Sequence, residues 1–243
     1  YSLSCEAASL RMALAYYGVA TNDDEILSRI GYAPQPRDTA TNTWQDPNVE
    51  FVGDVNGKIG VFVGTGKYLG ISDASTTTQS FYGVKDNLTA TGVGTPRTSG
   101  SFVKQTMVQG TCGANSPYCQ SGQVIRLGRG TDGTSPSENV DWATKDGWYF
   151  DLPLANERSY TDPQLVQGTL VFTSNIPDIT VCTSGGTSYL NAVDYTTGGA
   201  VEGSGGVVGV SLGNSLATRP VVAQLPNGKI IVLTLPLIHI SEP

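Results

Sequence analysis

The pattern of apolar and polar positions changes once along this chain of 243 residues. In the N-terminal part, apolar residues between Cys5 and Tyr17 recur at the spacing of a well-buried α-helix. Ser4 is a suitable N-cap for this helix and Gly18 is a suitable C′ residue. A second, short helix is predicted over residues 23–30, so the start of the chain is expected to be helical.

Residues 34–57 are rich in Pro, Asn and Gly and are predicted to form a loop. From Ile59 onward the helical spacing disappears, and short β-prone runs alternate with turn residues. These runs predict strands at residues 59–63, 80–84, 124–127, 148–151, 169–173, 188–194, 207–210, 221–224 and 229–234. Strands at this spacing over about 176 residues predict roughly four blades of a β-propeller. The expected fold class is therefore mainly β, a partial β-propeller preceded by a small α-helical fragment.

Two turn motifs support these strands. Pro226, Asn227 and Gly228 separate the last two predicted strands and form a strong hairpin signal. Asp194 and Gly198 delimit an Asp-x-x-x-Gly turn after a strand, of the kind that recurs in propeller blades. That turn is also the basis of a weak alternative, a propeller enzyme with a quinone cofactor.

Charge and composition narrow the classes of partner. The chain has 14 Lys and Arg against 21 Asp and Glu, which gives a net charge of −7. An acidic surface repels phosphate backbones, so nucleic acid is not expected as a partner. No apolar run reaches the roughly 18 residues that a membrane-spanning helix requires, and no secretory signal is recognisable. Because the first residue is Tyr rather than Met, we expect the chain to be a fragment.

The four cysteines do not follow a zinc-binding pattern. Cys112 and Cys119 enclose a small polar loop, which fits a local disulfide in an exported protein. Two reduced surface thiols fit the same spacing equally well, because spacing alone does not determine the pairing geometry. Cys182 has no obvious partner.

Cys5 is a candidate nucleophile. It lies at the N-terminus of the first predicted helix, where unpaired N–H groups and the helix dipole favour a thiolate. A catalytic thiol also requires a base, and His239 is the single histidine of the chain, close to its C-terminus. We therefore expect Cys5 to be catalytically inactive in this chain. The alternative is a small buried residue that closes the start of the helix.

The residues around Cys5 resemble a known family. Residues 4–14 together with Tyr17 and Gly18 resemble the nucleophile helix of papain-like bacterial cysteine peptidases, in particular the bacteriocin-leader-processing peptidases. Residues 44–48 and 51–54 are similar to a loop downstream of that helix. The resemblance implies that Cys5 corresponds to the catalytic thiolate of the family. In that family a His and an Asp or Asn follow much later in the chain, and this sequence departs from the family pattern before it reaches the His. Residues 1–58 are therefore interpreted as a truncated peptidase fragment.

The rest of the chain resembles a second family, the C-terminal β-propeller of the PilY proteins associated with type IV pilus tips. The matching blocks are residues 61–70, 78–86, 147–153, 156–158, 162–165, 168–177 and 182–190. The resemblance covers residues 59–234 and implies an exported, non-enzymatic protein. It implies a role in pilus extension and surface adhesion, with pilin-like subunits or a host surface as partners.

That resemblance also raises the question of calcium, which family members carry in an acidic loop. The chain lacks an Asp-x-Asp-x-Asp spacing, so no cofactor is predicted. Its acidic positions are instead predicted to lie in a solvated loop before a strand; they are Asp132, Glu138, Asp141, Asp146 and Asp151. The neighbouring aromatic pair, Trp148 and Tyr149, is expected to pack in the fold rather than to bind a ligand.

Residues 235–243 do not continue the pattern of the preceding strands and resemble translated adapter sequence, so we expect a non-native tail. A genuine C-terminal strand is the alternative. The expected organisation is a truncated peptidase fragment (residues 1–58), a partial PilY-like β-propeller (residues 59–234) and a non-native tail (residues 235–243). The first two parts are joined either by an assembly chimera, which we favour, or by a genuine gene fusion. Unpaired strand edges of a partial propeller predict poor solubility.

Overall fold

A computed structural model describes residues 52–55, 58–67, 77–87, 92–178, 185–224, 230–234 and 236–237. The chain divides into two units, residues 1–49 and residues 50–243, and all of the described residues belong to the second. Both predicted helices, Cys5, Cys182 and His239 lie outside these ranges. No helix in the described part of the chain has the length and apolar character needed to cross a membrane.

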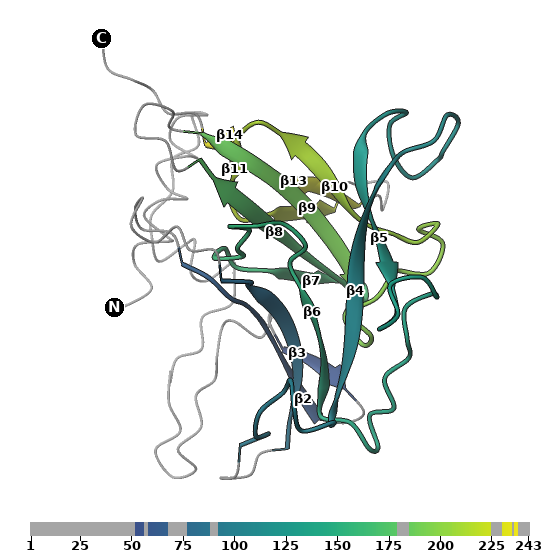
Figure 1. Cartoon of the computed structure of the whole chain (residues 1–243), viewed down its shortest axis with the longest axis vertical. Helices are drawn as coiled ribbons and strands as arrows, with labels where there is room; N and C mark the ends of the chain where they lie inside the picture. The colour runs from purple at the N-terminus through teal and green to yellow at the C-terminus, as the bar shows by residue number, and fades with distance from the viewer. Residues whose placement is uncertain are drawn as a thin grey trace. The chain divides into compact units, whose positions relative to one another are not determined.

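The described residues form fourteen β-strands (Figure 1). In chain order the strands are β1 (Val52–Val55), β2 (Lys58–Gly64), β3 (Ser80–Asp86), β4 (Phe102–Thr111), β5 (Val124–Arg129), β6 (Gly147–Asp151), β7 (Gln164–Val166), β8 (Thr169–Pro177), β9 (Gly186–Asp194), β10 (Val207–Gly213), β11 (Leu216–Ala217), β12 (Val221–Gln224), β13 (Ile230–Leu233) and β14 (Pro236–Leu237). The expectation of a mainly β fold is confirmed for this part of the chain.

Ten of these strands form one sheet in the order β1-β2-β3-β6-β4-β5-β10-β9-β8-β7. The long strand β4 joins its two halves. Residues Phe102–Gln105 of β4 pair in parallel with β6, and residues Thr106–Thr111 pair antiparallel with β5. Because one strand serves both halves, the sheet is continuous through β4, and Figure 1 shows it curling around its packed face.

A short segment after β6 links the two sides of this curl. The main chain of Arg158 pairs with Asn175 on β8, with N–H to oxygen bonds in both directions. The next residue, Ser159, donates its N–H to the carbonyl of Thr65, just beyond β2, at 3.1 Å. These bonds satisfy backbone groups that would otherwise be unpaired at the ends of β2 and β8.

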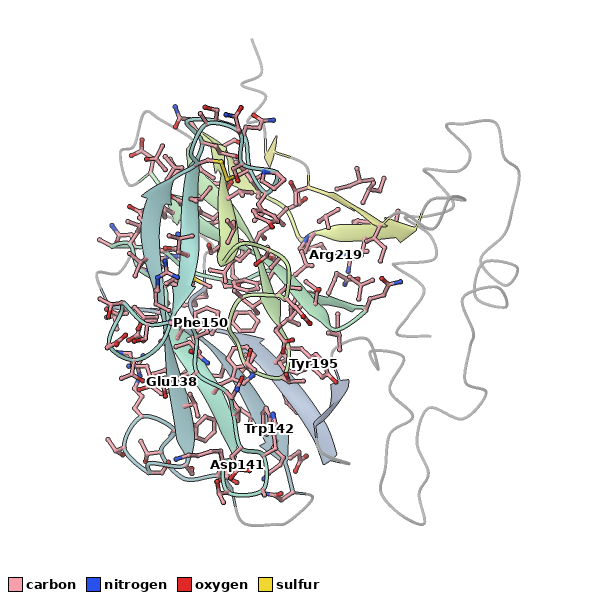
Figure 2. All side chains as sticks on the ribbon, turned by 90° about the vertical axis from the view of Figure 1, so that its right-hand side faces the viewer. Glu138, Asp141, Trp142, Phe150, Tyr195 and Arg219 are labelled. Carbon is pink, nitrogen blue, oxygen red and sulfur yellow. A yellow bond between two sulfur atoms is a disulfide. The ribbon has the colours of Figure 1, made fainter. Side chains whose placement is uncertain are left out.

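The packed face of the sheet is aromatic. Phe81, Phe150 and Phe172 stack on one another, with ring centroids of Phe81 and Phe172 4.2 Å apart. Trp148 is fully buried beside them and donates its Nε1–H to the carbonyl of Tyr195 at 2.9 Å. Figure 2 shows Phe150 among the packed side chains between the strands. Trp148 therefore packs in the core, as the sequence predicts, and contributes no exposed platform.

Two glycines make room for the indole ring of Trp148. A Cβ atom added at Gly83 on β3 or at Gly198 after β9 would overlap the indole. Gly198 also has a φ of +68°, a conformation that L side chains rarely adopt. It closes the predicted Asp194 turn, in which the carboxylate of Asp194 accepts the N–H groups of Thr196 and Thr197. The turn is confirmed, and its glycine has a packing reason as well as a conformational one.

All nine predicted strands are present, and no end differs from its predicted position by more than about four residues. The prediction of a loop over residues 34–57 is wrong at Val52–Val55, which form β1 because they pair antiparallel with β2. The ten-residue strand β4 was not predicted. The partial propeller of four blades stays a prediction, since the described strands form a continuous sheet through β4 instead of separate four-stranded sheets.

Two small sheets accompany the large one. β12 pairs antiparallel with β13, as the sequence predicts for the last two strands. β11 pairs antiparallel with β14, so Pro236 and Leu237 from the predicted tail continue a sheet. The turn between β12 and β13 lies outside the described ranges.

Candidate interaction site at the tip of the β4–β5 hairpin

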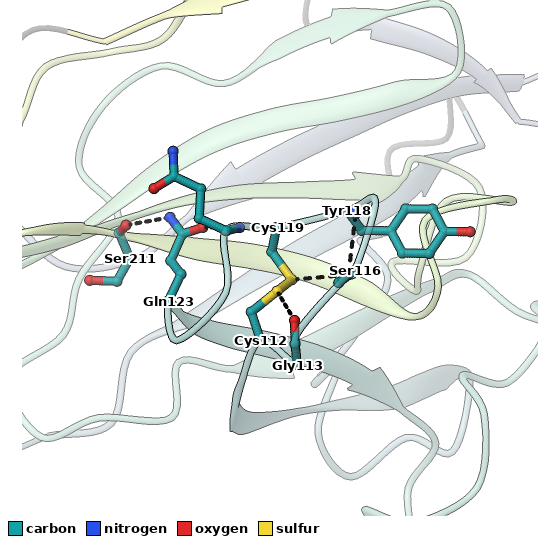
Figure 3. Close-up of a disulfide and its surroundings, with 8 residues drawn as sticks. Cys112, Gly113, Ser116, Tyr118, Cys119, Gln123 and Ser211 are labelled. Carbon is teal, nitrogen blue, oxygen red and sulfur yellow. Dashed lines mark hydrogen bonds between the residues drawn. A yellow bond between two sulfur atoms is a disulfide. The ribbon is translucent and has the colours of Figure 1, made fainter.

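The loop that joins β4 to β5, residues 112–123, contains a disulfide and several hydrogen bonds. Cys112 donates its N–H to the carbonyl of Gln123 at 2.8 Å and accepts the N–H of Gly122 at 2.9 Å, which extends the hairpin ladder by one step. A disulfide joins Cys112 to Cys119, with Cα atoms 5.9 Å apart (Figure 3). Of the two states that the sequence left open, the structure has the disulfide.

Further hydrogen bonds fix the loop inside the disulfide ring and beside it. Tyr118 donates its N–H to the Ser116 hydroxyl at 3.2 Å. Gln123 accepts the N–H of Gln120 through its side-chain oxygen and donates its amide to the carbonyl of Ser211 on β10 at 3.1 Å. A loop held this way loses little conformational entropy when it binds a partner.

Tyr118 is the exposed aromatic side chain of this loop. Its side chain is half exposed (48%), although its ring contacts Gly205 in the loop before β10. Gly205 has a φ of +63°, and a Cβ atom at that position would lie 2.5 Å from the tyrosine ring. The glycine therefore supports the ring from behind and leaves its outer side accessible to a partner. Tyr118 is the residue of this site that sequence reasoning missed.

The loop is also uncharged. Residues 112–123 contain no Lys, Arg, Asp or Glu, whereas the whole chain has a net charge of −7. Binding at this loop requires no charged group to lose its hydration, which is a large cost in polar interfaces. Charged residues are depleted, and Tyr is enriched, at the centres of protein interfaces. A rigid, neutral loop with an exposed tyrosine matches that composition.

A buried ion pair anchors the hairpin to the rest of the sheet. Arg126 on β5 and Glu157 lie 2.7 Å apart, and both side chains are fully buried. Arg126 also donates to Asn191 and Ser174, at 3.0 and 3.2 Å, and its guanidinium lies 3.5 Å from the centre of the Tyr189 ring. The arginine thus ties β5 to β8, β9 and the segment after β6.

Arg126 reaches across β10 to make these contacts, and a glycine allows it. A Cβ atom added at Gly209 on β10 would lie 2.6 Å from the Asn191 side-chain oxygen and 3.2 Å from Arg126. Gln109 on β4 donates its amide to the Tyr189 hydroxyl at 2.9 Å, so β4 is tied to β9 as well. The tip therefore rests on two strands, β5 held by the buried contacts of Arg126 and β4 by the partly exposed hydrogen bond of Gln109.

A second polar cluster lies on the face of β6 that bears Asp151, opposite the face that packs Trp148 and Phe150 into the core. Asp151 forms an ion pair with Arg97, accepts a hydrogen bond from the Ser80 hydroxyl at 2.8 Å and lies 3.6 Å from the Lys104 ammonium. Burial raises the pKa of the Asp151 carboxyl, but hydrogen bonds from Arg97 and Ser80 outweigh it, and the pKa lies below its ordinary value. Arg97 also lies over the Tyr149 ring. The cluster attaches the loop before β4 to the sheet.

The acidic positions around residues 132–151 do not converge. The Asp132 carboxylate accepts hydrogen bonds from the Ser135 hydroxyl and from the N–H groups of Thr134 and Ser135, which hold its pKa well below its usual range. Asp141 is stabilised in the same way by Thr144, and its pKa is lowered. The described ranges contain no group of three or more His, Cys, Asp or Glu that could hold a metal ion.

The candidate nucleophile Cys5 lies outside the described ranges, so the proposed peptidase site stays a prediction. Sequence reasoning also missed Arg126 and Glu157. The available signal was a charged residue inside the apolar run Val-Ile-Arg-Leu, since an arginine in a buried strand requires a partner.

Comparison with known proteins gives one partial similarity. A segment of 82 residues is 34% identical to a protein from Xylella fastidiosa (strain Temecula1) named "Type IV pilus biogenesis factor PilY1 homolog". The similarity covers 29% of this chain and 6% of that protein, so the chain spans a small part of its relative. It supports a relation to the PilY proteins, and the papain-like resemblance has no support from it. No family model matches the chain. No solved structure matches it either.

Proposed function

We propose that this chain is a segment of a type IV pilus-associated surface protein that takes part in pilus biogenesis and surface adhesion. The similarity to the PilY1 homologue over 82 residues is the observation that carries the proposal. In this proposal the chain acts without catalysis, by presenting loops to pilin-like subunits or to a host surface. Its sheet forms part of a larger β-propeller.

The tip of the β4–β5 hairpin is the contact surface in this proposal. The disulfide and the hydrogen bonds of Ser116 and Gln123 hold the loop in one conformation, and Gly205 supports the exposed ring of Tyr118. Tyrosine supplies a large contact area at a low entropic cost, since it has only two side-chain torsions. A partner surface with an apolar recess and hydrogen-bond acceptors fits this loop.

An exported location follows from the same proposal. Disulfides persist in oxidising environments such as the periplasm and the cell surface, and are rare in the cytosol. A short staple between the buried Cys112 and the half-buried Cys119 suits a loop that meets partners outside the cell.

The test is binding of the purified chain to isolated type IV pili, measured by biolayer interferometry. The variant Tyr118→Ala removes the exposed ring, and we expect it to weaken binding at least about tenfold, the effect of a loss of about 1.4 kcal/mol at an interface. Val63→Ala is the matched control, because Val63 on β2 is exposed to a similar extent (46%) and lies away from the tip. Absence of binding by the unmodified chain, or equal loss in both variants, contradicts the proposal.

A further inference from the structure

A recess lies beside the end of β2, where the segment that follows β6 packs against that strand. Its lining residues include Phe62 and Gly64 of β2, Gly66 and Lys67 just beyond the strand, and residues 159–163. The recess opens to solvent and has a volume of about 480 Å³, within the range of roughly 300–1,000 Å³ that small-molecule sites occupy. None of its described lining residues belongs to loop 112–123, so it is separate from the tip of the β4–β5 hairpin.

Contacts within the protein hold the walls of this recess in place. Arg158 donates a hydrogen bond from its guanidinium to the carbonyl of Lys67 at 3.0 Å, and the Ser159 hydroxyl donates to the carbonyl of Thr173 on β8 at 3.0 Å. The two walls approach closely because a Cβ atom added at Gly64 would lie only 2.6 Å from the Cβ atom of Ser159. A site that is formed before its ligand arrives loses less entropy on binding.

Tyr160 supplies an aromatic surface to the recess. The residue is half-buried, and its hydroxyl oxygen is buried within the protein. The part of this side chain that a ligand can contact is therefore the ring. The faces of an aromatic ring carry partial negative charge. They attract C–H groups with partial positive charge, such as the C–H groups beside the oxygen atoms of a sugar ring.

The charged residues of the recess favour a neutral ligand with hydroxyl groups. Lys67 and Asp162 both line it and are exposed, and the Asp162 side chain is 66% exposed and 4.0 Å from Arg219. The carboxylate repels an anion and the ammonium repels a cation. A hydroxyl group donates a hydrogen bond to a carboxylate and accepts one from an ammonium, so it satisfies both residues. The Thr161 hydroxyl, which also lines the recess, can serve either purpose.

We propose that this recess binds a neutral sugar. In this proposal the apolar C–H face of a pyranose ring packs on the ring of Tyr160, and its hydroxyl groups form hydrogen bonds with Asp162 and Lys67. The inference concerns a different surface from the tip of the β4–β5 hairpin and does not depend on the pilus-related function.

The test is saturation-transfer NMR on the full chain with the methyl glycosides of glucose, galactose, mannose and N-acetylglucosamine. At least one glycoside is expected to receive saturation from the protein, most strongly at the C–H groups of one face of its ring. Because the recess is open, the expected dissociation constant is on the order of 1 mM. Alanine, a zwitterion, and inorganic phosphate, an anion, are expected not to displace the sugar.

Three variants locate the binding. Asp162→Asn keeps the shape of an exposed side chain and is expected to raise the dissociation constant about fivefold, because a hydrogen bond to a charged acceptor is roughly twice as strong as a neutral one. Tyr160→Leu removes the ring and is expected to raise it about fivefold or more. The matched control is Glu202→Gln, which removes an equal charge at an exposed residue outside the recess and is expected to bind like the unmodified chain.

A thermal melt identifies any variant that does not fold, and Asp162→Asn, at an exposed side chain, remains informative if Tyr160→Leu fails. Tyr118→Ala is expected to bind the sugar normally, which separates this site from the proposed contact with pili. Three results would overturn the proposal: no saturation transfer to any of the four glycosides, equal effects of Asp162→Asn and Glu202→Gln, or displacement of the sugar by alanine or phosphate.

Discussion

Arg126 and Glu157 form an ion pair 2.7 Å apart with both side chains fully buried, although they come from segments that are 31 residues apart (157 − 126 = 31). Asn191 and Ser174 accept further hydrogen bonds from the same guanidinium. The pair and these hydrogen bonds join the β4–β5 hairpin to the segment after β6 and to strands β8 and β9.

Glu157→Gln is expected to destabilise the fold by about 3–5 kcal/mol, because it leaves the charge of Arg126 buried without its partner. The measurement is the free energy of unfolding from urea titration of the full chain. A double variant, Arg126→Met with Glu157→Leu, fills the same space without charge and is expected to be much closer to the unmodified protein. A Glu157→Gln variant as stable as the unmodified chain would contradict a stabilising role of the ion pair with Arg126.

Gly198→Ala is expected to be one of the more destabilising alanine substitutions in the chain. It places a methyl group against the Trp148 indole at a position with a positive φ. Gly203→Ala is a matched control, because Gly203 has a φ of +79° and open space around its Cα. The control is expected to lower the free energy of unfolding by about 1–2 kcal/mol for the backbone conformation alone. Gly198→Ala is expected to lower it by a further 1–3 kcal/mol or so for overpacking. Equal melting temperatures of the two variants would refute the packing argument.

The disulfide between Cys112 and Cys119 is expected to survive purification without reductant. Trypsin cleaves after Lys104 and after Arg126, which releases both cysteines in one peptide. Further cleavage by chymotrypsin after Tyr118 divides this peptide into two halves that stay linked by the disulfide. Alkylation without reduction should therefore leave this peptide unmodified and lighter by two hydrogen atoms than its reduced form.

Replacing both of these cysteines with serine is expected to lower the free energy of unfolding by about 2 kcal/mol, the value for closing a loop of this size. It should also weaken the proposed binding to pili, because the loop would no longer be pre-organised. Unchanged stability together with full alkylation would show that the thiols are reduced.

The ion pair of Asp151 predicts a specific pH dependence. The folded-state pKa of Asp151 is lowered, so the ionised carboxylate stabilises the fold above the unfolded-state pKa of about 3.9. This contribution is lost as the pH falls through the lower folded-state pKa. Asp151→Asn should therefore be less stable than the unmodified chain at pH 7, and the difference should shrink as the pH falls below about 4. Urea midpoints over a pH series measure it.

A suitable control for this series is Asp162→Asn, which removes an equal charge at an exposed side chain 4.0 Å from Arg219. Exposed ion pairs of this kind contribute little, so its midpoint should follow that of the unmodified chain. A difference between Asp151→Asn and the unmodified chain that stays constant with pH would exclude a charge effect at Asp151.

Cys5 provides a test of the peptidase resemblance. If it lies at a helix N-terminus, iodoacetamide should alkylate it at neutral pH faster than Cys182. Peptide turnover is not expected, because His239 is the single histidine of the chain and lies far from Cys5 in sequence. Peptidase activity abolished by Cys5→Ser would contradict the proposal of a non-enzymatic protein.

Sequence reasoning identified the strands whose patterns are local. The strand at Val221–Gln224 was predicted with its observed bounds, and the Asp194 turn with its glycine, because β-prone runs and turn chemistry depend on neighbouring residues. β4 was missed because its inward positions include Gln105, which reads as a surface residue. Gln105 is buried because its amide bonds the carbonyls of Glu138 and Thr197, residues that are distant in the chain.

The amino-acid sequence was sufficient to predict a mainly β fold, a resemblance to PilY proteins and a possible disulfide, since these depend on composition and short-range order. The tertiary structure was needed for the order of strands in the sheet, the burial of Arg126 against Glu157, and the support of Tyr118 by Gly205. Each of these joins segments that are far apart in sequence. Such contacts form only when the chain folds, because buried polar groups and close backbone approaches are compensated by partners from other strands.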